Sequence, residues 1–180
     1  MSADSIAAPP ASLDAKAIGQ ASGATATAAP DGVVKIGWPR TDVTVTVDGM
    51  TLPPAAGLGS WAAFAPMASG AMVMGDTVVF ADEVDAAMDA AFTHGLSVTA
   101  LHNHFFHDTP NVYFMHIGGE GRAETLAAGV KAVWGAIRAV RSTHALPRRR
   151  ALVAQRQRPA MSTRIRSAKS WANRRPIARA

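Results

Sequence analysis

Cysteine is absent from the 180-residue sequence, and this absence excludes several kinds of chemistry at once. A chain without cysteine has no disulfide framework, no thiolate zinc site and no cysteine nucleophile. Every apolar stretch is shorter than the roughly 18 to 20 residues that a membrane-spanning helix needs, so we expect no membrane span. The chain as written also opens without the basic and apolar regions of a secretory signal, so it is cytoplasmic as written, and the localisation stays open.

Acidic residues are absent from the end of the chain. Residues 148–180 contain eleven Lys or Arg and no Asp or Glu, whereas residues 1–147 hold seven basic and all 13 acidic residues. The net charge of +5 therefore combines a body of charge −6 with a strongly basic tail. Apolar residues in the tail follow no strand or helix period, so we predict disorder over residues 147–180. Two interpretations stay open: an arm that binds nucleic acid or anionic lipid through phosphates, or a functionless end such as an altered reading frame produces.

The body of the chain is typical of one small α+β domain. Hydrophobic residues make up 48% of the sequence, which is enough for a core. Residues 1–30 are rich in Ala, Ser, Thr and Pro, so we predict a mobile segment with a helical turn or two between residues 13 and 18. The domain itself is predicted over residues 31–146, where the patterns become regular.

Strand patterns dominate the first half of this domain. Apolar runs and alternation predict strands at 33–36, 43–47, 50–52, 61–64, 71–80, 96–104 and 112–117. The pair Asp48-Gly49 predicts a hairpin turn, and Gly75-Asp76 predicts a break in the strand that contains it. Alternating polar residues such as Thr44 and Thr46 indicate an antiparallel sheet with one face open to water.

Two stretches have the period of a helix. Asp82 is predicted to cap the first, and Gly95 to end it. Its buried face is predicted to hold Val84, Met88, Ala91 and Phe92. The second stretch runs from 123 to 141 and has the clearer pattern. The predicted order is therefore strands, helix, strand pair, helix.

Histidine is concentrated in one short segment. Four of the six histidines, His102, His104, His107 and His116, fall within fifteen residues. Alternation along a strand puts His102 and His104 on one face, and a hairpin can bring His116 beside them. His107, in the predicted connection, is a candidate fourth ligand.

Imidazole is the commonest protein ligand of transition metals, so this cluster predicts a site for zinc or another divalent transition metal. Three imidazoles with one open position would form a catalytic site, and a filled fourth position a structural or carrier site. Glu83 opens the helix just before the His-x-His strand and is a candidate ligand or partner of a ligand. The alternative is a histidine cluster on a wet sheet face that binds no metal.

At these residues the sequence resembles the LppY/LpqO family, a bacterial family built on a domain of unknown function. The similar motifs are AMVMGD at 71–76, DEV at 82–84, ALHNH at 100–104 and FMHIG at 114–118, with further likeness over 43–64. The resemblance covers roughly residues 13–146. It implies relatives that are longer, hold two copies of this unit and are often exported or lipid-anchored. By that comparison we expect this chain to hold a single copy of the unit, truncated or altered in frame at its end.

The family resemblance implies no known activity, so function must be predicted from the residues. The first hypothesis is a domain that binds a divalent metal or an unknown small ligand through His102, His104 and His116. The second is a zinc-dependent, peptidase-like hydrolase. Lysostaphin-type peptidases also need a histidine followed four residues later by aspartate, whereas His94 is followed by Val98. Nucleic-acid binding through residues 148–180 and a metal-free interaction domain are the other two hypotheses.

Overall fold

The computed structural model describes residues 12–144, so the predicted tail at 147–180 lies outside the described residues. Three α-helices occur in the described part: α1 (Ala15–Ser22), α2 (Val84–Thr93) and α3 (Ala123–Thr143), with short 3-10 turns η1 (Pro54–Ala56) and η2 (Ala81–Glu83). The strands are β1 (Ala26–Ala28), β2 (Val34–Pro39), β3 (Thr46–Val47), β4 (Met50–Thr51), β5 (Gly59–Pro66), β6 (Ala71–Phe80), β7 (Ser97–Asn103), β8 (Asp108–Thr109) and β9 (Val112–Gly121). The predicted α+β class is confirmed.

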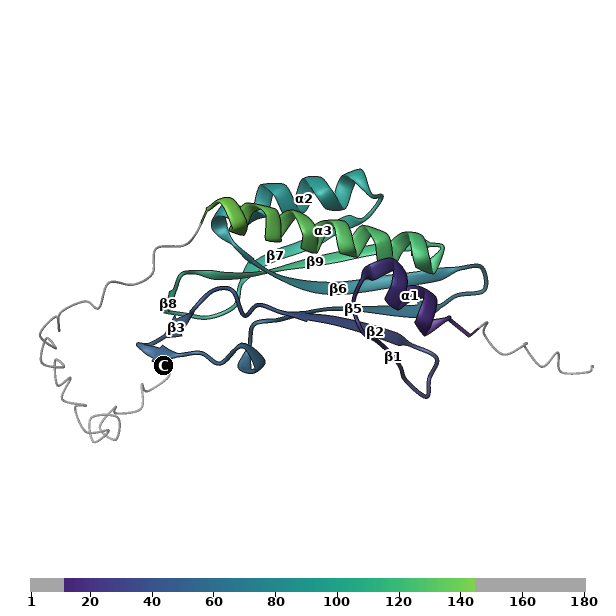
Figure 1. The fold of residues 1–180 in the computed structure, drawn as a ribbon, viewed down its shortest axis with the longest axis horizontal. Coiled ribbons are helices and arrows are strands. Elements are labelled where there is room, and N and C mark those ends of the chain that lie inside the picture. Colours follow the sequence, from purple (N-terminus) through teal and green to yellow (C-terminus); the bar gives the residue numbers. More distant parts are fainter. Residues whose placement is uncertain (1–11, 145–180) are drawn as a thin grey trace, which may run out of the picture. The chain divides into compact units, whose positions relative to one another are not determined.

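Six strands form one antiparallel sheet in the order β1-β2-β5-β6-β9-β7, and β4-β3-β8 form a small second sheet. The three helices lie on the same face of the large sheet, with α3 in contact with both α1 and α2 (Figure 1). Strand β6 runs without the predicted break, because Gly75 and Asp76 pair normally with β5 and β9. Within residues 12–144, no helix is both long enough and apolar enough to span a membrane.

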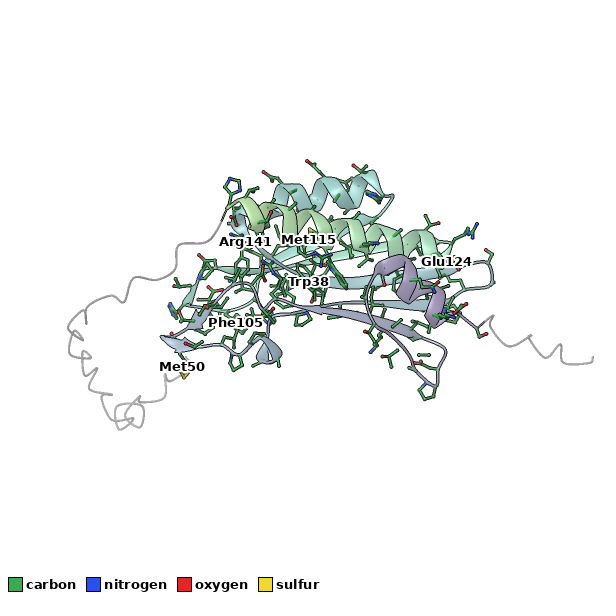
Figure 2. The ribbon with its side chains drawn as sticks, viewed as in Figure 1. Trp38, Met50, Phe105, Met115, Glu124 and Arg141 are labelled. Atoms are coloured by element: carbon green, nitrogen blue, oxygen red, sulfur yellow. The ribbon has the colours of Figure 1, made fainter. Side chains whose placement is uncertain are left out.

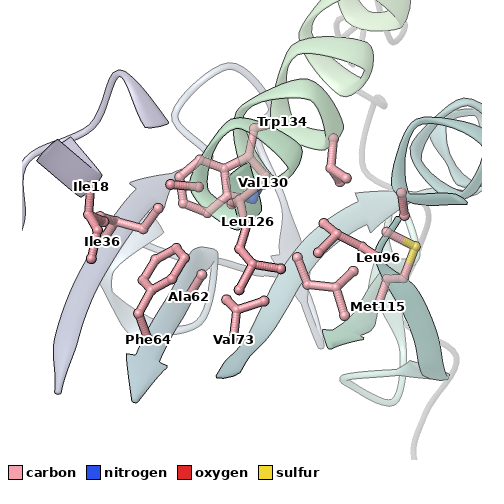
Figure 3. Close-up of a cluster of buried hydrophobic side chains, with 14 of the residues drawn as sticks. Ile18, Ile36, Ala62, Phe64, Val73, Leu96, Met115, Leu126, Val130 and Trp134 are labelled. Carbon is pink, nitrogen blue, oxygen red and sulfur yellow. The ribbon is translucent and has the colours of Figure 1, made fainter. Parts of the chain in front are cut away.

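The main core fills the space between the helices and the sheet (Figure 3). Helix α3 supplies Leu126, Val130 and Trp134, at the helical spacing that its sequence predicts. Trp134 is almost fully buried, and its indole Nε1 donates a hydrogen bond of 3.2 Å to Thr77 Oγ1 on β6. This bond satisfies the one polar atom that burial of the indole would otherwise leave without a partner.

A second core lies on the opposite face of the sheet, at one end. The segment between β2 and β5 covers this end and buries Val43, Val45 and Leu58 against the sheet residues Val78, Phe80, Val112 and Phe114. Phe105 packs at the edge of this second core, whereas Trp38 and Met115 belong to the main core (Figure 2). The rest of this face carries no helix, so both β6 and β9 have a part that stays open to solvent.

The N-terminal segment differs from the prediction. Residues 12–30, expected to be mobile, form α1 and β1, and Ile18 is completely buried in the main core. Asp14 caps α1 by accepting hydrogen bonds from the backbone N–H groups of Lys16 and Ala17. Ile18, the neighbouring apolar residues Leu13 and Ala21, which pack against the same core, and the Asp14 cap together fix this short helix, and composition alone does not reveal this.

Two further predictions need correction. Only Thr46–Val47 of the predicted strand 43–47 pairs as a strand, because Val43 and Val45 instead point into the second core from an unpaired segment. Phe92, predicted on the buried face of α2, is 59% exposed, and Ala87 and Ala91 are the buried positions of that helix.

Candidate functional site

Three strands bring histidines and one carboxylate together on the open face of the large sheet. His116 on β9 stands opposite Asp76 on β6 and opposite Ala100 on β7. His102, two residues after Ala100, stands opposite Phe114 on β9. Residues that face each other across antiparallel strands project to the same side, so His102, His116 and Asp76 share one face.

The polar atoms of these three side chains converge on one nitrogen. His102 Nε2 lies 3.1 Å from His116 Nε2, and the two rings meet edge to face with centroids 5.1 Å apart. Asp76 Oδ1 lies 3.5 Å from the same His116 Nε2. His102 Nδ1 lies 3.2 Å from the backbone oxygen of Asn103. Because that oxygen only accepts, a hydrogen bond there requires Nδ1 to donate, and in the neutral ring with this tautomer Nε2 of His102 carries the lone pair that faces His116.

Asp76 is the most constrained member of the group. Its side chain is only 19% exposed, and its Oδ1 is buried without a hydrogen bond from any residue that the structure describes. Burial raises the pKa of Asp76, against the lowering effect of the imidazoles of His116, His102 and His104. A buried carboxylate oxygen without a donor is costly, and it is therefore a place where a cation would gain.

The other two predicted histidines stay outside this contact. The ring of His104 packs against Phe114 and Phe105, with centroids 3.9 and 4.4 Å away, and lies 6.5 Å from the ring of His102. Burial lowers the pKa of His104. His107 sits in the turn before β8 with φ of 57°, and its backbone oxygen accepts from the N–H of Asp48. The structure thus brings His102 and His116 into contact, whereas the ring of His104 packs against two phenylalanines and His107 lies in the turn before β8.

Glu83 has a different environment from the one the sequence predicted. Its carboxylate is fully buried and accepts hydrogen bonds from Arg40, from Arg141 and from the backbone N–H of Phe80, at 2.7 to 2.9 Å. Asp82, predicted to cap α2, instead pairs with Arg141 at 2.6 Å. With both oxygens of Glu83 held by guanidinium groups, this residue is a structural ion-pair centre and is not free to bind a metal.

The geometry is close to that of a metal centre but is not complete. No set of three or more His, Asp or Glu side chains within residues 12–144 has the arrangement of a ready-made metal centre. The two imidazole nitrogens nevertheless have the separation of two ligands on one ion, since ligands about 2.0–2.1 Å from a tetrahedral zinc lie about 3.3 Å apart. The separation of Asp76 Oδ1 from His116 Nε2, 3.5 Å, is close to the same value.

Comparison with known families covers most of the described part. Residues 16–136 match the model of a family described as Domain of Unknown Function (DUF1259). The chain belongs to this family. No curated protein and no solved structure matches the chain. The start of the match at residue 16 includes α1 in the DUF1259 domain, in agreement with the buried position of Ile18.

Sequence reasoning missed Asp76 as a member of the site in this DUF1259 domain. The signal was present, because Asp76 is the one charged residue in the ten-residue strand β6. A lone carboxylate in an apolar strand usually has a partner on a neighbouring strand. The register with β9, which places His116 opposite, cannot be read from the sequence because 40 residues separate the two positions.

Proposed function

We propose that this DUF1259 domain binds a divalent transition metal such as zinc through His102, His116 and Asp76. The observation that carries the proposal is the convergence of two imidazole nitrogens and one carboxylate oxygen at His116 Nε2. The backbone acceptor on His102 Nδ1 supports it as well, because metal-binding histidines commonly donate their second N–H to a carbonyl group.

A cation would also remove one unfavourable feature of the group, because Asp76 Oδ1 has no donor among the described residues. A divalent ion gives a Lewis-acid partner to all three atoms at once. His116 and Asp76 are partly exposed, 38% and 19%, so both side chains have room to turn toward an ion.

The same geometry argues against a proton relay of the hydrolase type. In a relay, a carboxylate holds one ring nitrogen of histidine while the other nitrogen acts on the substrate. Here Asp76 and His102 both approach Nε2 of His116. Hydrolysis by a metal-activated water therefore depends on the metal site, and binding is the function to test first.

The finer family assignment is part of this proposal. We propose that the chain is an LppY/LpqO-type member of its family, since its AMVMGD, ALHNH and FMHIG motifs supply Asp76, His102 and His116 respectively. In this view three of the four motifs that carry the resemblance meet in space at the metal ligands, and the fourth, DEV at 82–84, does not.

The experiment is a calorimetric titration of the untagged, metal-free full chain with Zn²⁺, Cu²⁺ and Ni²⁺, followed by metal analysis after gel filtration. We expect stoichiometric binding that His102→Ala/His116→Ala abolishes. His104→Ala/His107→Ala is the matched control, since it removes two imidazoles from the same segment that lie outside the contact. Circular dichroism checks that each variant is folded.

Two results would contradict the proposal: no metal bound by the wild-type chain, or equal binding by the His102→Ala/His116→Ala variant. Loss of binding in the control variant alone would shift the ligands to His104 and His107. A small organic ligand that binds without metal would support the alternative ligand-binding hypothesis.

A further inference from the structure

The open face of the sheet carries exposed sulfur beside the histidine pair. Met72 and Met74 on β6 are 38% and 41% exposed, and both lie on the helix-free face with Asp76, since residues two apart on a strand share a face. Met74 stands opposite Gly118 on β9, while Asp76 stands opposite His116. Met74 is therefore the next position along from the carboxylate of the proposed site.

Gly118 leaves room for the thioether of Met74 over β9. A Cβ atom at position 118 would lie only 3.2 Å from Met74 Sδ, so the sulfur occupies the space that a side chain there would fill. His116 is two residues before Gly118 on the same strand and projects to the same face, about 7 Å away along the chain. Methionine has three rotatable bonds, so the thioether of Met74 is free to turn along the open face toward His116.

Resting on the proposed metal function, we infer that the same two imidazoles have two alternative third ligands, and that the domain also binds cuprous copper, Cu⁺, through His102, His116 and Met74. Thioether sulfur is a soft donor that favours Cu⁺, whereas protein sites for zinc use thiolate, imidazole and carboxylate. Because the chain has no cysteine, thioether is its softest donor.

The two third ligands differ in charge as well as in softness. Asp76 contributes a negative charge, which a divalent ion attracts more strongly than a monovalent ion does. Met74 contributes a neutral, polarisable sulfur and lies on the more exposed side of the group. The site would thus distinguish Zn²⁺ from Cu⁺ by its third ligand, which is Asp76 for Zn²⁺ and Met74 for Cu⁺.

A crossed pair of variants tests this inference on the untagged full chain. Cu⁺ affinity is measured without oxygen by competition with a chromogenic Cu⁺ chelator, and Zn²⁺ affinity by competition with a zinc indicator. We expect Met74→Leu to weaken Cu⁺ binding by about tenfold or more and to leave Zn²⁺ binding unchanged. Asp76→Asn is expected to do the reverse. Met72→Leu is the matched control, an equally exposed methionine on the same strand and face.

The outcomes distinguish failure of the Cu⁺ inference from failure of the proposed metal binding. If Met74→Leu keeps full Cu⁺ affinity, or loses no more than Met72→Leu does, the inference is wrong even where zinc binding through the histidines holds. If the wild-type chain binds neither ion, the proposed function and the inference both fail. A sulfur neighbour of copper in the X-ray absorption spectrum, lost in Met74→Leu, would support the inference directly.

Discussion

Arg40 donates hydrogen bonds from both Nη atoms to the two carboxylate oxygens of Glu83, at 2.7 and 2.8 Å, and neither side chain is exposed. Arg141, which lies near the end of α3 (Figure 2), adds a third bond to the same carboxylate at 2.8 Å. One buried carboxylate thereby connects the segment after β2, the turn before α2 and the last turn of α3. Arg40 also lies over the rings of Trp38 and Phe80, which shield the pair from water.

Glu83→Gln is expected to lower the free energy of unfolding by about 3–5 kcal/mol, because it leaves two guanidinium groups without their shared, buried counter-charge. Urea denaturation at neutral pH measures the loss. Glu124→Gln, at the other end of α3, is the control, because the ion pair of Glu124 with Arg122 is long, at 4.0 Å, and exposed to solvent. That control should change stability by less than about 1 kcal/mol. If the two substitutions lowered the free energy of unfolding equally, the buried network would contribute no more to stability than an exposed ion pair.

The carboxylates around this network predict how stability depends on pH. Burial alone would raise the pKa of Asp42 and of Asp82, but hydrogen bonds from Arg40 and Arg141 hold both below their usual range. A lowered pKa in the folded state adds stability above the unfolded value of about 3.9, and this stability is lost as the pH falls through the folded value. The protein should therefore lose stability below about pH 4. In Asp42→Asn/Asp82→Asn this acid dependence should be shallower in urea titrations between about pH 2 and 5, and an unchanged slope would contradict the assignment.

Sequence periodicity predicts the elements whose apolar residues recur at a regular spacing. It does not predict contacts between residues that are far apart in the sequence. Helix α3 and strand β6 have a clear apolar period, and both are in place. The ion pair of Arg40 and Glu83 joins residues 43 positions apart, so no local pattern reports it. The same limit applies to Glu83: its nearness in sequence to β7 predicts a place beside the histidines, whereas its actual partners, Arg40 and Arg141, are distant in sequence.

Gly75 illustrates a correct observation with a wrong interpretation. The glycine predicted a break in β6, yet the strand is continuous. Glycine is required there because the neighbouring strands leave no room for a side chain. A Cβ atom at position 75 would lie 2.9 Å from the backbone oxygen of Trp61 and 3.1 Å from Ile117. The residue marks a close approach between neighbouring strands, which sequence alone does not distinguish from a turn.

Gly75→Ala is accordingly expected to destabilise the domain by about 1–3 kcal/mol, because the backbone of β5 cannot move away without disturbing the sheet. Gly59→Ala, on β5, is the matched control, since a Cβ atom there meets nothing within 4 Å. Thermal or urea denaturation of both variants decides the point. If both glycines tolerate alanine equally, the close approach at Gly75 is not a constraint on the fold.

The candidate site shows the same division between local and distant information. Spacing along one strand and the hairpin predict that His102 and His116 lie close together, and the two side chains do make contact, but no sequence pattern excludes His104. The ring of His104 instead packs edge to face against Phe105 and at a tilt against Phe114. Asp76 enters the group only through the register of β6 with β9.

Trp61 provides an optical test of where a metal binds. It stands opposite Asp76 on the neighbouring strand β5, on the same open face, and is 43% exposed. A paramagnetic ion such as Cu²⁺ at His102, His116 and Asp76 would be within reach of the indole and should quench its emission, whereas Zn²⁺ should quench it far less. We expect the Cu²⁺-dependent part of the quenching to be lost in Trp61→Phe and in His102→Ala/His116→Ala, and to persist in His104→Ala. Quenching that survives in Trp61→Phe would place the ion near a different tryptophan and away from the open face of β6.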